Sequence, residues 1–153
     1  MRYFTLDLYK RMQKEDVRNE FLTACNRYSK YIRTLSNKYF NAKSLDILLS
    51  NKLHDCEISS LNISDKKGLV LDIVLSKYDK QLYIITYRGL SRLEYPIMQN
   101  KKHRKNDDNS FGYWLYDEVV KSNQSIVHEI MFNSYKVLTI QCSNINIRKY
   151  FAP

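Results

Sequence analysis

The chain of 153 residues is long enough to bury a hydrophobic core of its own, so we expect one domain over residues 1–153. Its 44% of hydrophobic residues and 13% of aromatic residues exclude a chain that is disordered throughout. The 25 Lys and Arg residues outnumber the 16 Asp and Glu residues, and the net charge of +9 suits either an acidic protein or nucleic acid as partner or a solvated surface without a partner.

The N-terminal residues and the cysteines predict a cytoplasmic protein. The opening MRYFTLDLYKRMQ is charged every few residues, unlike a signal peptide, and no segment has the apolar length of a membrane span. Cys25, Cys56 and Cys142 are widely spaced and stand in apolar surroundings, which indicates free core thiols. We therefore expect no disulfide framework, no cofactor and no association with a membrane.

Residues 1–52 show helical periodicity and are expected to form a helical layer. Thr5 is a candidate N-cap for a short helix that ends at Met12. A further short helix is expected from Ser44 to about Asn51.

A longer helix is expected between these two, from a cap at Asp16 to about Phe40. Its apolar residues recur at steps of three and four, as on the buried face of an amphipathic helix. The opposite face is basic and carries Arg27, Lys30, Arg33 and Lys38. This basic face is a candidate surface for an acidic partner.

From residue 53 onward the apolar residues alternate, which is typical of β-strands. The alternation predicts strands over residues 57–64, 68–76, 81–89, 113–120, 126–132, 135–142 and 145–150. Helices and strands do not alternate along the chain, so a parallel sheet is disfavoured. We expect an α+β fold in which N-terminal helices pack on an antiparallel sheet of about six or seven strands, over residues 53–153.

The stretch LYDEVVKSNQSIVHEI at residues 115–130 predicts a β-hairpin with two alternative registers. A turn centred on Asn123 places Glu118 opposite His128 and forms a charge-assisted pair. A shift by one residue places Glu118 opposite Glu129, where like charges repel.

A His–carboxylate pair suits general acid–base catalysis, but the hairpin lacks a nucleophile at an informative spacing. His128 also alternates with Ile126 and Ile130, as a histidine of the core would. We therefore assign no catalytic residue and leave three roles open: a structural pair, a contact with a partner, and catalysis.

His54 and Asp55 stand where the last helix ends and the first strand begins. Together with Glu118 and His128 they form a candidate polar site, provided that the sheet brings residue 54 beside the hairpin. Histidines are not spaced as in the HxxxH or HxH patterns, so no metal site is predicted.

A second basic segment lies between the predicted strands. It contains Lys101, Lys102, Arg104 and Lys105. This segment either is a solvated loop or binds phosphate groups, in which case nearby Trp114 could stack on a base or anchor a protein partner.

Several short sequence motifs, spread over most of the chain, resemble those of known protein families. RYFTLDLYKRMQ at the start, LHDCEISSLNIS at the helix-to-sheet junction and the strand pair LYDEVV and IVHEIMF resemble a family of small cytoplasmic bacterial proteins of unknown function. The final strands also resemble those of immunity proteins that block bacterial toxins. The first resemblance implies no particular activity, and the second implies protein binding.

Together these patterns favour a non-catalytic, protein-binding module that recognises an acidic protein partner, with an immunity-type protein as one instance. A basic nucleic-acid-binding protein is the alternative, and a small enzyme with a His/Glu pair is the third possibility.

Overall fold

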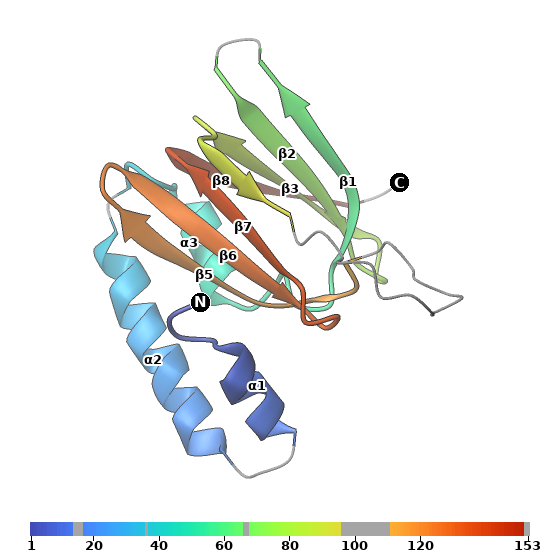
Figure 1. Ribbon diagram of the computed structural model, residues 1–153. Coiled ribbons are helices and arrows are strands. Elements are labelled where there is room, and N and C mark those ends of the chain that lie inside the picture. The colour runs from blue at the N-terminus through green and yellow to red at the C-terminus, as the bar shows by residue number, and fades with distance from the viewer. Residues whose placement is uncertain (14–16, 36, 66–67, 96–110, 152–153) are drawn as a thin grey trace, which may run out of the picture.

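The computed structural model describes residues 1–13, 17–35, 37–65, 68–95 and 111–151. Within these residues three helices precede eight strands, and the strands form two antiparallel sheets (Figure 1). The α+β class and the order of helices before strands, predicted from the sequence, are confirmed.

The helices α1 and α3 begin where side chains can satisfy free backbone N–H groups. In α1 (Leu6–Met12) the hydroxyl of Thr5 accepts a hydrogen bond from the N–H of Leu8 at 3.1 Å, as predicted. In α3 (Ala42–Leu49) the side chain of Asn41 accepts from the N–H of Ser44 at 2.8 Å. The predicted start of α3 at Ser44 is two residues too late, because the side chain of Asn41 caps the helix and lets it begin at Ala42.

The long helix α2 (Arg18–Thr34) is shorter than expected. Leu35 is already extended, with ψ of 131°, and the side chains of Leu35, Tyr39 and Phe40 are buried. The helix ends here because these three side chains enter the core from an extended backbone and do not extend the apolar face of α2. Asp16, the expected cap, lies outside the described residues, and Val17 occupies the N-cap position without a side-chain hydrogen bond.

The eight strands are β1 (Glu57–Ser64), β2 (Val70–Ser76), β3 (Gln81–Arg88), β4 (Arg92–Glu94), β5 (Trp114–Ser122), β6 (Ser125–Phe132), β7 (Val137–Cys142) and β8 (Asn144–Phe151). One sheet has the order β1-β2-β3-β8 and the other has the order β4-β7-β6-β5. Seven of these strands match those predicted, whereas the short β4 was not expected. The division into two sheets also differs from the expected single sheet.

A sharp bend in one pair of strands explains this division. The pairing of β3 with β8 ends at Arg88 and Asn144, and the pairing of β4 with β7 resumes at Arg92 and Gln141. Gly89 lies at the corner with φ of +62°, and a Cβ there would stand 2.5 Å from Oγ of Ser143. One antiparallel ribbon therefore bends and contributes strands to both sheets.

The facing sides of the two sheets share one hydrophobic core with the helices. Leu71, Ile73 and Ile85 come from one sheet, and Ile130 and Ile140 come from the other. Cys56 and Cys142 are also buried and free. Burial raises the pKa of Cys56 to about 11 and that of Cys142 to about 12, so both thiols stay protonated near neutrality.

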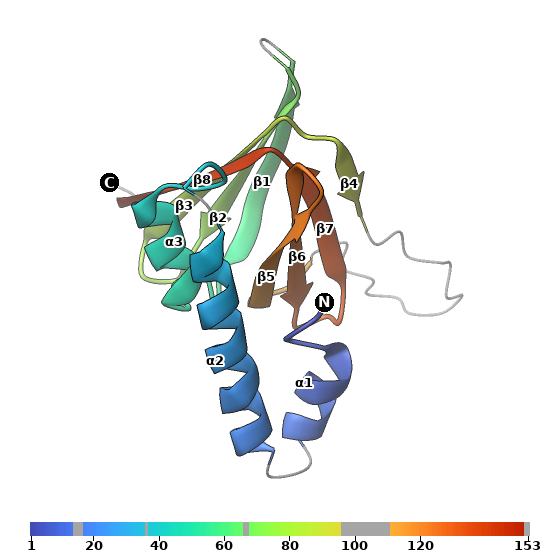
Figure 2. The same ribbon diagram turned by 90° about the vertical axis from the view of Figure 1, so that its left-hand side faces the viewer.

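The helical layer covers one edge of each sheet (Figures 1 and 2). At the edge of β5, the hydroxyls of Tyr28 and Tyr31 in α2 accept hydrogen bonds from the N–H groups of Val119 and Lys121, each at 2.8 Å. At the edge of β8, Oγ of Ser44 accepts from the N–H of Ile147 at 2.8 Å. These contacts satisfy strand groups that would otherwise be free to pair with another chain.

Candidate functional site

The hairpin of β5 and β6 adopts the register in which Glu118 lies opposite Glu129 and Val119 lies opposite His128. The alternative register, with Glu118 opposite His128, is not formed. Because successive side chains of a strand point to opposite faces, Glu118 and His128 lie on different sides of the sheet. The His/Glu pair considered for catalysis is therefore not formed.

The N-terminal segment resolves the expected repulsion between Glu118 and Glu129. The carboxylate of Glu118, which is fully buried, accepts hydrogen bonds from the N–H groups of Arg2, Tyr3 and Phe4. The amino group of Met1 lies 3.0 Å from Oε1 of Glu129. Backbone dipoles and one positive charge therefore neutralise the two carboxylates, and the like-charge register becomes favourable.

His128 belongs to a hydrogen-bond network on the other face, between the sheets. Its Nδ1 lies 2.9 Å from the hydroxyl of Tyr87, and its Nε2 lies 3.1 Å from Oδ2 of Asp117. Oδ1 of Asp117 accepts a hydrogen bond from Nε1 of Trp114 at 3.0 Å. His128 is fully buried and satisfied, as its alternation with apolar neighbours in the strand predicted.

Tyr87 contributes a hydroxyl group to this network. Burial raises the pKa of Tyr87 well above its ordinary value, so its hydroxyl keeps its proton. When this hydroxyl donates to Nδ1 of His128, the neutral imidazole carries its proton on Nε2 and donates it to Asp117. Both ring nitrogens of His128 then have a partner.

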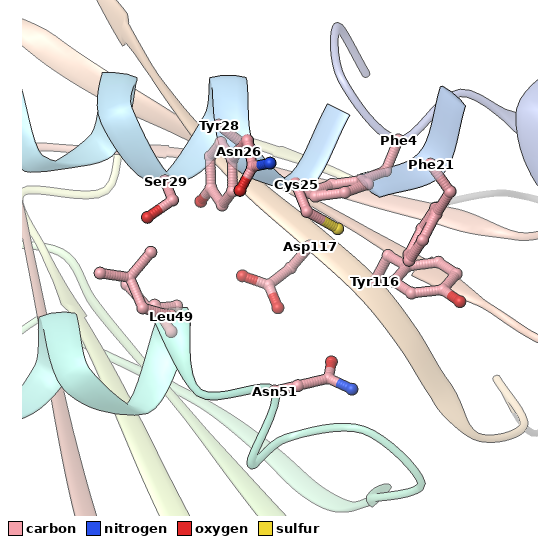
Figure 3. A pocket seen from close by; sticks show the side chains of 11 residues that line it. Phe4, Phe21, Cys25, Asn26, Tyr28, Ser29, Leu49, Asn51, Tyr116 and Asp117 are labelled. Carbon is pink, nitrogen blue, oxygen red and sulfur yellow. The ribbon is translucent and has the colours of Figure 1, made fainter. Parts of the chain in front are cut away.

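Asp117 also faces a cleft of about 340 Å³ between α2, β5 and the end of α3. Figure 3 shows its carboxylate in the space between α2 and the segment from Leu49 to Asn51. Aromatic rings of Phe4, Phe21 and Tyr116 line one part of the cleft. The cleft thus combines apolar walls with one oriented carboxylate, which is typical of small-molecule sites.

Cys25 lines the same cleft, but it is a poor nucleophile there. Burial raises the pKa of its thiol, so the reactive thiolate is disfavoured. The geometry of the cleft therefore suits binding better than covalent chemistry.

The four residues of the predicted polar site are not brought together. His54 and Asp55 contact each other at 3.0 Å, and the ring of His54 lies beside Tyr116 of β5 with the centroids 5.9 Å apart. Residue 54 therefore does lie beside the hairpin, but the hydrogen bonds of Glu118 and His128 in the described residues involve other partners. Glu118 faces the N-terminal segment, and His128 lies between the sheets. Asp117 was not among the predicted site residues. It lies two residues before Val119 in β5, and this spacing places both side chains on the same face of the strand.

The structure describes the residues of only one of the two predicted basic surfaces, together with Trp114. Arg27, Lys30 and Arg33 are exposed on α2, whereas Lys38 is exposed beyond the end of the helix. Trp114 is only 1% exposed, so the role of a surface anchor or a base-stacking residue is wrong for this side chain. Lys101, Lys102, Arg104 and Lys105 lie outside the described residues.

Among the described residues, no three His, Cys, Asp or Glu side chains gather closely enough to hold a metal ion.

None of the helices in the described ranges has both the length and the apolar character needed to span a membrane.

One solved protein structure is similar to part of this chain. No family model matches the chain, and no curated protein sequence matches it. A crystal structure of an uncharacterized protein from Neisseria gonorrhoeae is similar to 62% of this chain and to 91% of its own chain, with a TM-score of 0.48 and 11% sequence identity. The resemblance to a family of small bacterial proteins and to immunity proteins stays a prediction.

Proposed function

We propose that the protein is a non-catalytic, protein-binding module that recognises an acidic surface of a partner protein through α2. The observation that carries this proposal is the exposed row of Arg27, Lys30 and Arg33, which we call the basic row. Tyr28 and Ile32, on the opposite side of α2, are buried and hold the helix against the rest of the protein. The basic row is thus exposed on an anchored helix. Figure 2 shows the course of α2 beside the two sheets.

The charges of the basic row are not used within the described part of the protein. No carboxylate there lies within ion-pair distance of Arg27, Lys30 or Arg33. Glu20, the acidic residue in the first turn of α2, binds Arg11 at 2.7 Å. Complementary charge at such a surface would speed association and select an acidic partner.

Two observations favour a protein over a nucleic acid. The indole of Trp114 is buried and therefore unavailable for stacking on bases. Three basic residues along one helix also form a compact patch, whereas nucleic-acid binding depends on neutralising many phosphates along a groove. An immunity-type protein that blocks a toxin is one instance of the proposed class.

Burial of the acid–base groups supports a non-catalytic role. Glu118 is enclosed by backbone N–H groups, and His128 is enclosed between the sheets, so neither side chain can reach a substrate in this arrangement. General acid–base catalysis requires the acting group within hydrogen-bond reach of the substrate.

A paired charge reversal tests the proposal. The double variant Arg27→Glu with Arg33→Glu removes the basic row, and Lys43→Glu with Arg88→Glu makes the same change in net charge at exposed positions elsewhere. Each protein is immobilised and used to capture partners from a nuclease-treated lysate of the host, and the captured protein is then purified and titrated at several salt concentrations. We expect the first variant to bind at least about tenfold more weakly and the control to bind within about twofold of wild type.

Equal affinity of the two variants for the captured protein would exclude the basic row. Capture from an untreated lysate that is lost when the lysate is treated with nuclease, together with a steep decrease of binding with salt, would favour the nucleic-acid alternative.

A further inference from the structure

We propose that the cleft beside α2 binds a small organic cation, a primary amine or guanidinium group on an apolar stem, with Asp117 as its counter-ion. This proposal does not depend on the function proposed for the basic row, although Asn26 and Ser29 of the cleft stand next to Arg27 and Lys30 in α2.

The carboxylate of Asp117 is held in a fixed position. Nε1 of Trp114 and Nε2 of His128 donate to its two oxygens at 3.0 and 3.1 Å, and only 11% of the side chain is exposed. Each carboxylate oxygen can accept more than one hydrogen bond. A ligand donor can therefore bind to the remaining acceptor positions without breaking the network.

Within the described ranges, the negative charge of Asp117 forms no ion pair with a Lys or Arg side chain. Among these residues the only ion-pair distance of Asp117 is the 3.1 Å to Nε2 of His128, a contact that is ionic only when the imidazole is protonated. The described residues that line the cleft include no Lys or Arg. A largely buried carboxylate that no Lys or Arg side chain neutralises is costly, so a positive ligand in the cleft gains a favourable interaction with it.

The aromatic walls suit the same kind of ligand. The ring centroid of Tyr116 lies 5.2 Å from that of Phe21 and 5.6 Å from that of Phe4, and all three residues line the cleft. Aromatic faces attract organic cations and also cover an apolar stem. The side chains of Asn26 and Ser29 add oxygen atoms that could accept hydrogen bonds from an ammonium or guanidinium group.

The same features argue against an inorganic cation. Calcium takes six to eight oxygen ligands and magnesium requires a nearly octahedral shell. The described lining supplies one carboxylate among aromatic rings. A volume of about 340 Å³ instead fits a small organic ligand.

The protein contains one tryptophan, and its indole N–H donates to Asp117. The NMR signal of this N–H is therefore a direct reporter of the site. The probes are benzylamine, neutral benzyl alcohol and anionic benzoate, which share a ring and differ in charge. We expect benzylamine to shift the indole signal saturably with a Kd on the order of millimolar, benzyl alcohol to bind at least about tenfold more weakly, and benzoate to have no effect.

Two variants connect this binding with Asp117. Asp117→Asn keeps the size of the side chain and should abolish the preference for benzylamine over benzyl alcohol. Ser29→Lys places a lysine on the wall of the cleft and should compete with benzylamine, whereas Thr23→Lys adds the same charge at an exposed position of α2 outside the lining. Thr23→Lys should bind benzylamine as wild type does, and the pair of lysine variants provides a test even where Asp117→Asn fails to fold.

The source of the cationic group is distinguished by a further probe, N-acetyl-lysine methylamide. Binding comparable to that of benzylamine would indicate a lysine side chain of a peptide, and a clear preference for benzylamine would indicate a free amine. The proposal is overturned by equal binding of benzylamine and benzyl alcohol, by absence of any saturable shift, or by unchanged benzylamine binding to Ser29→Lys.

Discussion

Asp117 and Glu118 are neighbours in β5, but the two faces of the strand give their carboxylates different surroundings. Glu118 is fully buried and accepts three backbone hydrogen bonds from residues 2–4. Asp117 accepts two side-chain hydrogen bonds and faces a cleft. The difference shows that one carboxylate attaches the N-terminal segment, whereas its neighbour faces a space that the chain leaves open.

The largest expected effect comes from matched amide substitutions of these two residues. Glu118→Gln replaces one acceptor oxygen by a donor group opposite backbone N–H groups, so we expect a loss of about 3 kcal/mol in the free energy of unfolding. Asp117→Asn retains an acceptor for Trp114, and we expect a loss of about 1 kcal/mol. Urea unfolding followed by circular dichroism measures both values, and equal losses would contradict the assignment of different roles.

Alkaline pH tests the network on the side of Asp117. Burial raises the pKa of Tyr87 well above the ordinary value of 10.0. Its stabilising contribution is fully present below this ordinary value and decreases above it, because the unfolded chain releases the proton first. The free energy of unfolding should fall there by up to about 1.4 kcal/mol per pH unit for each such group.

Tyr87→Phe should reduce the slope of this decrease, as determined by urea unfolding at a series of pH values. Tyr78→Phe is the control, because Tyr78 is 88% exposed and should leave the curve unchanged. An equal slope in wild type and Tyr87→Phe would show that this hydroxyl does not contribute as proposed.

A smaller effect is expected at the edge of β5, which positions both carboxylates. Tyr28→Phe removes the acceptor for the buried N–H of Val119, and we expect a loss of about 1.5 kcal/mol. Tyr31→Phe removes the acceptor for the more exposed N–H of Lys121, and we expect about 0.5 kcal/mol because water can replace the hydroxyl. Amide hydrogen exchange should accelerate more at Val119 in the first variant than at Lys121 in the second.

The candidate site was predicted less well than the elements that carry it. The inward orientation of His128 followed from its alternation with Ile126 and Ile130, and burial confirms it. The partner of His128 was not predicted, because charges across the hairpin favour the other register until the N-terminal segment neutralises Glu118 and Glu129. The N–H groups that neutralise Glu118 come from residues more than a hundred positions away.

The class of fold and most of its elements could be predicted from the sequence, because helical and strand periodicities are local. Thr5 capped α1 as expected, and seven of the eight strands followed from alternation. The bend at Gly89, the division into two sheets and the placement of Asp117 at the cleft became known from the folded chain alone. Each depends on contacts between distant segments, whose free energies do not appear in the pattern of any one segment.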